Sequence, residues 1–410
     1  MGAYSSVYAC SQKGILTPTS YNSTSFELPD KSYSLSVTEP VNDAGSFELT
    51  IPLVGDYIDG TGLSGIGQRL FSESDPVITG YYGQHLIPSC FIVPHTSNSS
   101  RDLILLSEKV TIRYENGVAK TVLSGTLGNG MLSRWTAWNT SPFSTTMGPS
   151  LADNFGITKT YTGSMSAVAS YIIGNNMNAT GRPNSDVLVT VVVSSANSDS
   201  YSLAYGSNNT ILDCLKLIAS KVKNSFYLGP YQLSPSPGTT PFRLLIEGWQ
   251  DRSKAVVFSQ NKDLSSFSIG SELMKNTFWF GSIGDSKNAN SVSGGIYSND
   301  YYPNIGYWSE RKITPSSTVD TGNTYNDNWT NFNNSIDDAQ IEDRPKNNAS
   351  AVIASENSGF VFARDYDLGD IISFDVMGHR FSSQLVTHSF TLGDGDYKEG
   401  IQLGGNSSWI

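Results

Sequence analysis

The chain has 410 residues and a formal net charge of −11. A chain of this length can bury several small cores and exceeds one ordinary domain, so about two to four domains are expected. The acidic balance, without clusters of Lys and Arg, argues against a nucleic-acid-binding protein, because neutralising phosphates requires clustered cations. No window approaches the roughly 18 consecutive apolar residues of a membrane-spanning helix, so we expect no membrane anchor.

The composition favours strands joined by tight turns. The chain contains 38 Gly, 21 Tyr and 18 Phe, together with abundant Ser, Thr and Asn. Aromatic and β-branched side chains suit a pleated, half-buried surface, and Gly and Asn suit the turns between strands. The expected class is therefore β-rich.

The three cysteines do not suggest a disulfide framework. Cys10, Cys90 and Cys214 are odd in number, widely spaced and without a CxxC pair. This pattern is typical of a reducing compartment, and we expect buried thiols.

The first 135 residues alternate polar and apolar positions in short runs. Strands are predicted at residues 33–37, 46–52 and 109–114. Asn116-Gly117 separates two such runs, and Asn-Gly is the strongest short-range hairpin signal. A meander that folds into a sandwich or a small barrel follows.

The middle of the chain contains two predicted helices. Thr210 and Asp213 form a capping-box pattern before an apolar stripe that begins at Ile211, and this helix should end near Asn224. The second helix should begin after Ser164.

We expect the second helix to stop at Gly174-Asn175. The run Asp186–Val193 is apolar nearly throughout, as in a strand that is covered on both faces. The middle region therefore reads as a small α/β layer.

Strand patterns return from Phe242 onward. Residues 281–345 form a long polar insertion, which we expect to be either loop-rich and functional or flexible. Turns at Asp367–Asp370 and Met377-Gly378 then introduce a final β-meander.

No motif in the chain indicates catalysis or a metal site. The histidines have no HExxH or other metal-ligand spacing, and there is no GxSxG elbow or Cys-His signature. Adjacent Asp337 and Asp338 lie in a polar stretch that is typical of solvated carboxylates. The acidic residues after Asp365 lack the calcium-loop spacing and its closing Glu. We therefore expect no enzyme activity, no cofactor and no bound metal.

Four segments, in chain order, resemble the central tail-hub proteins of siphophages. They are residues 39–49, 123–135, 251–276 and 364–372. This family comprises the baseplate hub or minor tail proteins, including the hub portion of tail-associated lysins. Residues 52–105 and 281–345 match it poorly. The residues that carry the resemblance are Gly45, Ser46, Phe47, Gly125, Arg134, Asp251, Arg252, Phe258, Asn276, Asp367, Gly369 and Asp370.

The resemblance implies a β-rich α+β fold, with two tube-type β-barrels or sandwiches and a small α/β region between them. The implied domains are a first barrel at residues 1–135, the α/β region at 136–270, and a second barrel at 271–410 that carries the insertion. Three chains would form a ring at the distal tip of the virion tail, joining the six-fold tail tube to three-fold tip machinery.

The resemblance also implies particular partners and a place of assembly. The partners would be two further copies of the chain, the distal tail protein or tail tube, the tape-measure protein, and tip or receptor-binding proteins. Double-stranded DNA would only pass through, and assembly would take place in the cytoplasm of the bacterial host. Because a basic wall would hold passing DNA, we expect acids to outnumber Lys and Arg along the channel.

One alternative remains open at this stage. A stand-alone carbohydrate-binding protein could use exposed aromatic residues as sugar platforms, and the candidates are Trp135, Trp138, Trp249, Trp279, Trp308, Trp329, Tyr301 and Tyr302. Such aromatics more often pack in cores or subunit contacts.

Overall fold

The computed structural model describes residues 2–10, 25–28, 33–52, 90–115, 118–138, 159–178, 188–206, 209–230, 242–271, 276–283, 292–297, 308–313, 333, 347–354, 359–393 and 396–409. The chain forms two compact units. The first contains residues 1–268, 350–403 and 409–410, and the second contains residues 269–349 and 404–408.

The first half of the chain supplies these elements: β1 (Tyr8–Cys10), β2 (Ser25–Glu27), β3 (Ser34–Pro40), β4 (Ser46–Pro52), β5 (Cys90–Val93), the 3-10 helix η2 (Ser99–Arg101), β6 (Leu103–Glu115), β7 (Val118–Leu127), α3 (Gly130–Ser133), β8 (Lys159–Ser164), α4 (Met165–Asn176), β9 (Val189–Ser194) and β10 (Ser200–Tyr205). The second half supplies these: α5 (Ile211–Val222), β11 (Asn224–Pro230), β12 (Phe242–Gly248), β13 (Val257–Ser259), β14 (Leu264–Ser271), β15 (Asn276–Ile283), β16 (Val292–Tyr297), β17 (Trp308–Ile313), β18 (Asn347–Ile353), β19 (Ile371–Val376), β20 (His379–Gly393) and β21 (Asp396–Trp409).

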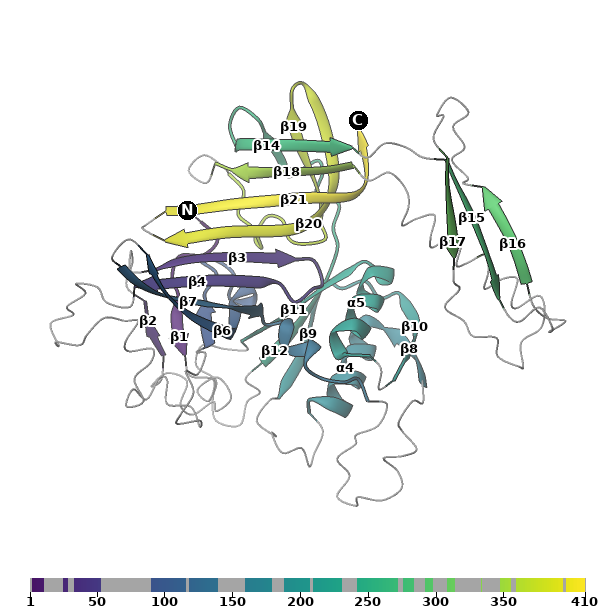
Figure 1. Cartoon of the computed structure of the whole chain (residues 1–410), viewed down its shortest axis with the longest axis horizontal. Coiled ribbons are helices and arrows are strands. Elements are labelled where there is room, and N and C mark those ends of the chain that lie inside the picture. The colour runs from purple at the N-terminus through teal and green to yellow at the C-terminus, as the bar shows by residue number, and fades with distance from the viewer. Residues whose placement is uncertain are drawn as a thin grey trace, which may run out of the picture. The chain divides into compact units, whose positions relative to one another are not determined.

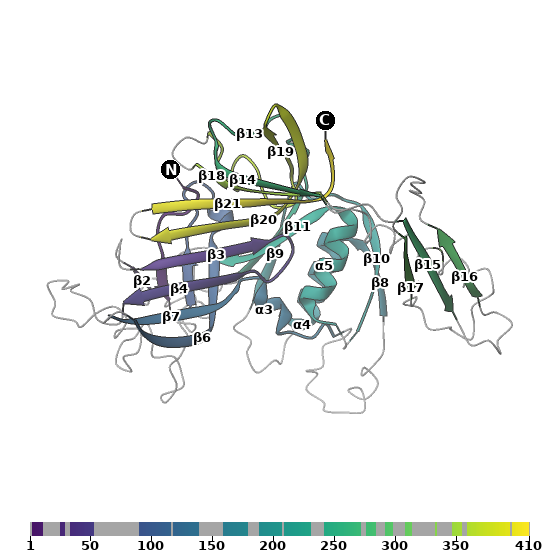
Figure 2. The same cartoon turned by 45° about the horizontal axis from the view of Figure 1, so that its top comes forward.

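Thirteen of the described strands form one sheet. Its main path runs β14-β18-β21-β20-β3-β4-β7-β6-β5-β1-β2, and β13 and β19 join it through β20. Figure 2 shows β21, β20, β3, β4 and β7 lying side by side. Strands from the beginning and the end of the chain are thus direct neighbours, and β3 pairs with β20 from Pro40 opposite Thr387 to Ser34 opposite Gly393.

Alternating side chains explain why these strands form a sheet with one buried side. Leu35 and Val37 of β3 are buried, whereas Ser34 and Ser36 are exposed. A two-residue period of this kind places one side of the sheet on a core and the other in solvent. The strands predicted at residues 33–37, 46–52 and 109–114 are confirmed as β3, β4 and part of β6.

The β6–β7 hairpin contains a β-bulge. The register shifts between Ser107 and Lys109, opposite the segment of β7 that holds Gly125. A Cβ atom at Gly125 would overlap the carbonyl oxygen of Leu106, so only glycine fits here. The predicted Asn116-Gly117 turn lies outside the described residues, although the flanking strands pair Glu115 with Val118.

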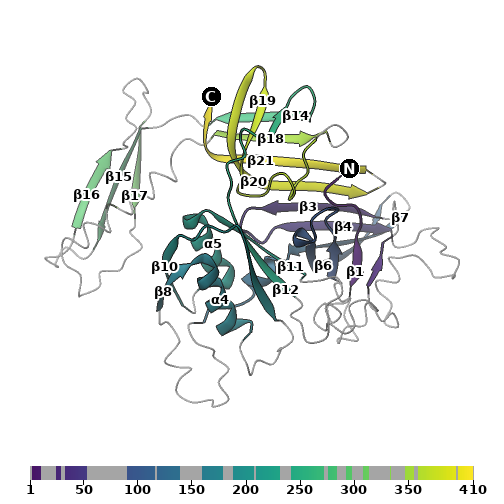
Figure 3. The same ribbon diagram turned by 180° about the vertical axis from the view of Figure 1, so that it is seen from behind.

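The middle region is a layer of helices and small sheets, coloured teal in Figure 3. Strands β11, β12 and β9 form one sheet, and β8 pairs with β10. The capping box predicted at the start of α5 is confirmed: the Thr210 hydroxyl accepts from the Asp213 backbone N–H, and Asp213 accepts from the Thr210 backbone N–H. One buried cluster combines α4 and α5 with Ile104 and Leu106 of β6, so this layer shares a core with the sheet.

Two predictions for the middle region were wrong in detail. Helix α4 begins after the Ser164 N-cap as predicted, but it continues to Asn176 through Gly174, because a glycine inside a helix weakens it without ending it. Strand β9 is not covered on both faces: it is an edge strand, and Val193 is 51% exposed. Its apolar composition therefore predicted a strand correctly but not its position in the sheet.

The second compact unit lies in the segment predicted to be a polar insertion. Strand β15 pairs antiparallel with β16 and parallel with β17. The described residues of 281–345 thus include regular sheet, and whether the rest of the segment is loop-rich or flexible stays a prediction.

The β-rich α+β class is confirmed by these sheets and few helices. The three-domain division stays a prediction, and its boundary at residue 270 falls within β14. Figure 1 shows β3 next to β20 in the same sheet, so the first and last predicted domains are joined by strand pairing. No helix in the described part of the chain is long and apolar enough to cross a membrane.

We predict that Gly125→Ala destabilises the protein, because the new methyl group meets backbone that cannot move without breaking the bulge. The free energy of unfolding should fall by about 2–4 kcal/mol in urea denaturation. Gly174→Ala is the matched control, since a Cβ there meets nothing within 4 Å and alanine favours the helix. It should raise the free energy of unfolding by about 0.5–1 kcal/mol. Equal effects of the two substitutions would contradict this account.

Candidate functional site

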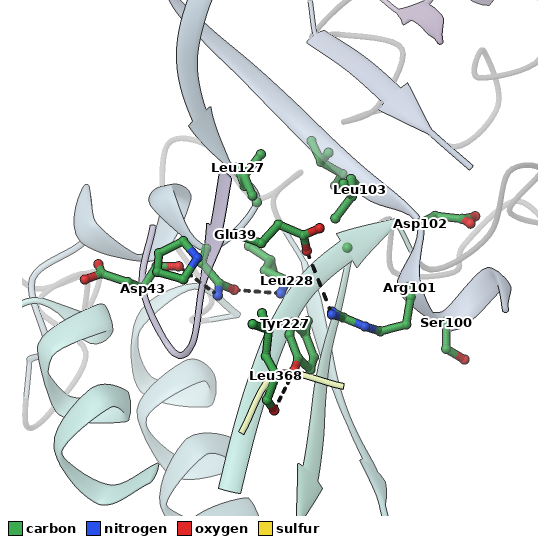
Figure 4. Close-up of a pocket in the computed structure, with 15 residues that line it drawn as sticks. Glu39, Asp43, Ser100, Arg101, Asp102, Leu103, Leu127, Tyr227, Leu228 and Leu368 are labelled. Atoms are coloured by element: carbon green, nitrogen blue, oxygen red, sulfur yellow. Dashed lines mark hydrogen bonds and ion pairs between the residues drawn. The ribbon is translucent and has the colours of Figure 1, made fainter. Parts of the chain in front are cut away.

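A network of buried ionisable groups lies where the large sheet meets the middle layer. We call it the polar junction and define it by Glu39, Arg101, Asp367, Asp370, Tyr227, His388 and Glu399. Glu39 comes from β3, Arg101 ends η2, Tyr227 comes from β11, and the others come from the last 50 residues. Figure 4 shows Arg101 reaching toward Glu39 beside Tyr227.

Arg101 is at the centre of the polar junction and is only 1% exposed. Its Nη2 atom lies 2.8 Å from Asp367 Oδ1 and 3.8 Å from Glu39 Oε2. Its guanidinium carbon lies 3.3 Å from the centre of the Tyr227 ring, a cation-π contact. Burial alone would lower the pKa of Arg101, but the surrounding acidic groups, Asp367 foremost, raise it above the usual value, so the buried charge is kept.

His388 is fully buried between two carboxylates. Its Nδ1 lies 3.0 Å from Glu39 Oε1, and its Nε2 lies 3.2 Å from Glu399 Oε1. Its ring stacks on Phe362 with centroids 3.6 Å apart. Burial opposes the charge, but the two carboxylates outweigh it and raise the pKa of His388 to about 9. At neutral pH this histidine is a cation that neutralises part of two buried acids.

His95 also contacts Phe362, but unlike His388 it is neutral. Its Nδ1 accepts hydrogen bonds from the backbone N–H groups of Ser97 and Asn98, so its Nε2 carries the proton and donates to the Phe362 carbonyl at 2.8 Å. Burial lowers the pKa of His95 and favours this neutral form. The same bonds order the turn before η2 and thereby position Arg101.

Asp370 joins the polar junction to the segment that follows β12. Its carboxylate accepts from the backbone N–H of Gln250 at 2.8 Å, from Arg252 Nε at 2.8 Å and from the Asp367 backbone N–H at 3.0 Å. Gly369 has a φ of +94° and faces the Trp249 ring so closely that a Cβ would overlap it. Glycine is therefore required at this position by both conformation and space.

Two asparagines complete the contact by acting as a substitute strand along the edge of β11. Asn42 accepts from the Phe226 N–H and donates to the Asn224 carbonyl, at 3.0 and 2.9 Å. Asn129 accepts from the Leu228 N–H at 2.8 Å and donates to the Phe226 carbonyl at 3.1 Å. These side chains satisfy backbone groups that another strand would otherwise bind.

The cavity beside the polar junction is small, about 30 Å³. Its walls include Glu39, Arg101, Tyr227 and the backbone of the β7–α3 turn (Figure 4). This volume suits about one water molecule, whereas small-molecule sites usually offer about 300 Å³ or more. Glu39 pairs with Arg101 beside it, Asp43 pairs with Lys216, and Asp102 accepts from the backbone N–H of His95. The arrangement is therefore suited to holding elements together.

The structure brings only some of the residues of the tail-hub resemblance into this site. Asp367, Gly369, Asp370 and Arg252 meet at the polar junction, as described above. Gly45 has a φ of +64° in the β3–β4 turn, where a Cβ would crowd Leu127.

The remaining residues of the resemblance lie elsewhere. Ser46 and Phe47 begin β4, with Phe47 buried, and Gly125 lies at the β-bulge. Arg134 pairs with Glu108 at 2.7 Å on the surface, and Asp251 accepts from Ser253. Phe258 is fully buried beside Phe374, and Asn276 begins β15 in the second compact unit.

Those of the other candidates from the sequence that the structure describes do not form a chemical site. Within the described ranges no cluster of three potential metal ligands exists. The carboxylates of Asp365, Asp367 and Asp370 each bind an arginine. Trp249 donates its indole N–H to Ser225, and Trp135 packs against the shared core, so neither is an open sugar platform. His85, Asp337, Asp338, Trp329, Tyr301 and Tyr302 lie outside the described residues.

Sequence reasoning missed Glu39, Arg101, His388 and the two capping asparagines. Glu39 and His388 occupy inward positions of strands that otherwise carry apolar residues there, and this break in alternation was the available signal. Arg101 carried no comparable signal.

Known structures share this fold over the whole chain. The 43 kDa tail protein of prophage MuSo2 from Shewanella oneidensis superposes with a TM-score of 0.53 at 10% identity, covering 97% of this chain and 98% of that one. The tail protein from Neisseria meningitidis MC58 gives a TM-score of 0.51 at 12% identity, covering 99% and 97%. The chain therefore has the fold of phage tail proteins, as the resemblance implied. No family model and no curated protein matches the sequence.

We predict that Arg101→Met is strongly destabilising, because it leaves the partly buried carboxylate of Asp367 without its cation and leaves the buried carboxylate of Glu39 with His388 in place of two cations. The free energy of unfolding should fall by about 3–5 kcal/mol. Arg134→Met is the control, because both members of its ion pair are 46% exposed, and it should cost less than about 1 kcal/mol. Adding Asp367→Asn to Arg101→Met should restore part of the loss. An Arg101 variant as stable as the Arg134 variant would show that the polar junction is unimportant.

We also predict that His388 makes stability depend on pH in the alkaline direction. Because folding raises the pKa of His388 from 6.5 to about 9, the contribution of its charge is complete below pH 6.5 and is lost as pH rises through about 9. The difference in unfolding free energy between wild type and His388→Gln should therefore shrink by roughly 3 kcal/mol over that range. His379→Gln removes an exposed histidine and should leave the profile unchanged. A constant difference for His388→Gln would refute the assignment.

Proposed function

We propose that the protein is a structural subunit of a phage tail hub, as in siphophages, that forms a trimeric ring at the distal end of the tail. The observation that carries this proposal is the likeness in fold to two phage tail proteins, which extends over nearly the full length of both. Fold alone does not define function. The polar junction supports a structural role, since its groups are engaged in holding strands and the middle layer together.

The topology of the sheet supports assembly into a ring. The described sheet path ends at β14 on one side and β2 on the other. Open strand edges invite pairing with another chain, and head-to-tail contacts of this kind close into rings when the rotation allows. With two tube-type barrels from each chain, three copies would present six barrels to the six-fold tail tube. The same ring would present a three-fold face to the tip proteins, and the tape-measure protein would lie in the tail tube above the ring.

The solvent-facing side of the sheet is the surface that we propose lines the channel. Hydroxyl groups dominate it on β3, β4 and β20, as at Ser36, Thr50 and Thr391. On β4, β6, β7 and β21, the described charged side chains that alternation and register place on this side are Glu48, Lys109, Arg113, Lys120, Asp396 and Lys398.

This side gives the expected acidic wall no support. Cations outnumber acids among the residues just named, whereas Glu39, Asp367, Asp370 and Glu399 are used inside the polar junction. A sparsely charged, hydroxyl-rich wall would also let DNA pass, because few phosphates could be neutralised at once.

The copy number of the protein in intact particles tests the trimeric ring. We expect three copies per tail by quantitative mass spectrometry with isotope-labelled peptides, scaled to the portal or another component of known copy number. This expectation concerns the assembled tail. If ring closure needs the other tail proteins, the free protein is monomeric and the tail still contains three copies. One or six copies per tail would rule out the trimer.

A further inference from the structure

Glu247 of β12 brings a further carboxyl group to the polar junction. It is the direct cross-strand partner of Ser225 in β11, so both side chains project from the same side of this strand pair. On that side Ser225 donates its hydroxyl to the Leu368 carbonyl at 2.7 Å. Tyr227, at the next position of β11 on this side, donates its hydroxyl to Asp367 Oδ1 at 3.1 Å. Glu247 therefore faces the loop before β19, and its carboxyl group is hydrogen-bonded to that of Asp367.

A hydrogen bond between two carboxyl groups requires a proton on one of them, because an ionised carboxylate has no donor. Asp367 is the acceptor of the pair. Its Oδ1 accepts from Arg101 Nη2 at 2.8 Å, from the Tyr227 hydroxyl at 3.1 Å and from the Leu368 backbone N–H at 2.7 Å. Three donors on one oxygen, one of them a cation, favour an ionised carboxylate there. The proton therefore resides on Glu247.

The cations of this region are already paired with other acids. The ion pairs are Arg101 with Asp367 and Glu39, His388 with Glu39 and Glu399, and Arg252 with Asp370. Arg243, on the same side of β12, donates to the Ser99 carbonyl, and the neighbour of Glu247 on β9 is the uncharged Ser194. In the described part of the chain Glu247 has no ion pair of its own. A partly buried carboxyl group without a cation is more stable with its proton, since burial disfavours the charge.

The groups that face Glu247 act on its charge in opposite directions. Burial has the largest effect on its pKa and raises it, and the carboxylates of Asp367 and Asp370 raise it further. Arg101 of η2 acts in the other direction without outweighing them, and the pKa of Glu247 is about 7. Burial also raises the pKa of Tyr227 above its ordinary value, so this residue stays a neutral donor beside the pair.

We propose that Glu247 and Asp367 form a site that binds one proton and thereby holds β12 to the loop before β19. With the proton present, the Glu247 O–H donates to the Asp367 carboxylate. When a base in solution takes the proton, the electron pair of the O–H bond stays on Glu247, and two anions face each other without a donor. Their repulsion weakens the contact between strand and loop, while the hydrogen bonds of Ser225 and Tyr227 remain. The proposal rests on contacts within one chain and does not depend on a role in phage tails.

The proton makes stability depend on pH in a definite direction. Folding raises the pKa of Glu247 from 4.5 to about 7, so the folded protein binds this proton more tightly than the unfolded chain does. The stabilisation is therefore complete below about pH 4.5 and is lost as pH rises through about 7. Glu247→Gln removes the titration, because a side-chain amide can donate to Asp367 at any pH.

Urea denaturation of full-length wild type and Glu247→Gln between about pH 4.5 and pH 8 tests the direction and size of the effect. The unfolding equilibrium constant of wild type, divided by that of the variant, should rise roughly a hundredfold over this range. Other groups, including His388, titrate in both proteins and cancel in the ratio. Glu108→Gln is the matched control, since Glu108 is 46% exposed and pairs with Arg134 at the surface. The corresponding ratio for this control should stay within about fivefold.

Infrared difference spectroscopy of the folded proteins locates the proton. At about pH 6, wild type minus Glu247→Gln should show the C=O stretch of a protonated carboxylic acid, and the band should disappear by about pH 8. The same difference is then recorded with Asp367→Asn present in both proteins. There the band should be lost at a lower pH, because the neighbouring negative charge is gone. A glutamate that is merely buried would lose its proton at the same pH with either side chain at position 367.

Any of four results would overturn the proposal. These are a ratio of unfolding constants that does not change with pH, no protonated carboxyl band in wild type at about pH 6, a band whose loss occurs at the same pH with Asp367→Asn, and a Glu247→Gln variant that does not fold at about pH 8. Asp367→Asn also removes a partner of Arg101. If that substitution prevents folding, the urea series and the wild-type spectrum decide.

Discussion

The structure of the larger unit depends on one buried charge, that of Arg101. A guanidinium that is 1% exposed is tolerable only if acidic groups surround it, because transferring an unpaired charge from water costs several kcal/mol or more. Those groups come from β3 and from the loop before β19, which are separated by more than 300 residues of chain. The pairing therefore holds the beginning and the end of the chain against η2 and β11.

Other polar groups extend this constraint outward. His388, which lies in β20, forms ion pairs with Glu39 and Glu399. Asp370 forms an ion pair with Arg252, which follows β12. Asn42 and Asn129 occupy the edge of β11, so the middle layer contacts the sheet through hydrogen bonds with fixed directions. The angle between these two layers is therefore fixed, which is what the proposed ring of head-to-tail contacts would require.

Local patterns in the sequence were sufficient for the elements but not for the contacts between them. The Thr210–Asp213 capping box and the alternation in β3 act over a few residues, so both were readable directly. The positive-φ glycines at 45 and 369 are among the residues of the resemblance, while the side chains that leave no room for a Cβ there, Leu127 and Trp249, are distant in sequence. The polar junction depends on pairings across hundreds of residues, which no short pattern encodes.

The edge position of β9 shows the same limit. An apolar run was read as a strand covered on both faces, yet burial depends on which neighbours the sheet provides, and β9 has β12 on one side. Likewise, the acidic net charge gave no information about where the acids lie, and it did not predict that Glu39, Asp370 and Glu399 are buried in ion pairs.

Electron microscopy of intact particles carrying an affinity tag in this chain tests the central claim most directly. If the protein is a tail-hub subunit, gold-labelled antibody against the tag marks the distal end of every tail. Label along the tail shaft, on the capsid, or absent from particles that are shown to contain the tag in denatured form would contradict the account.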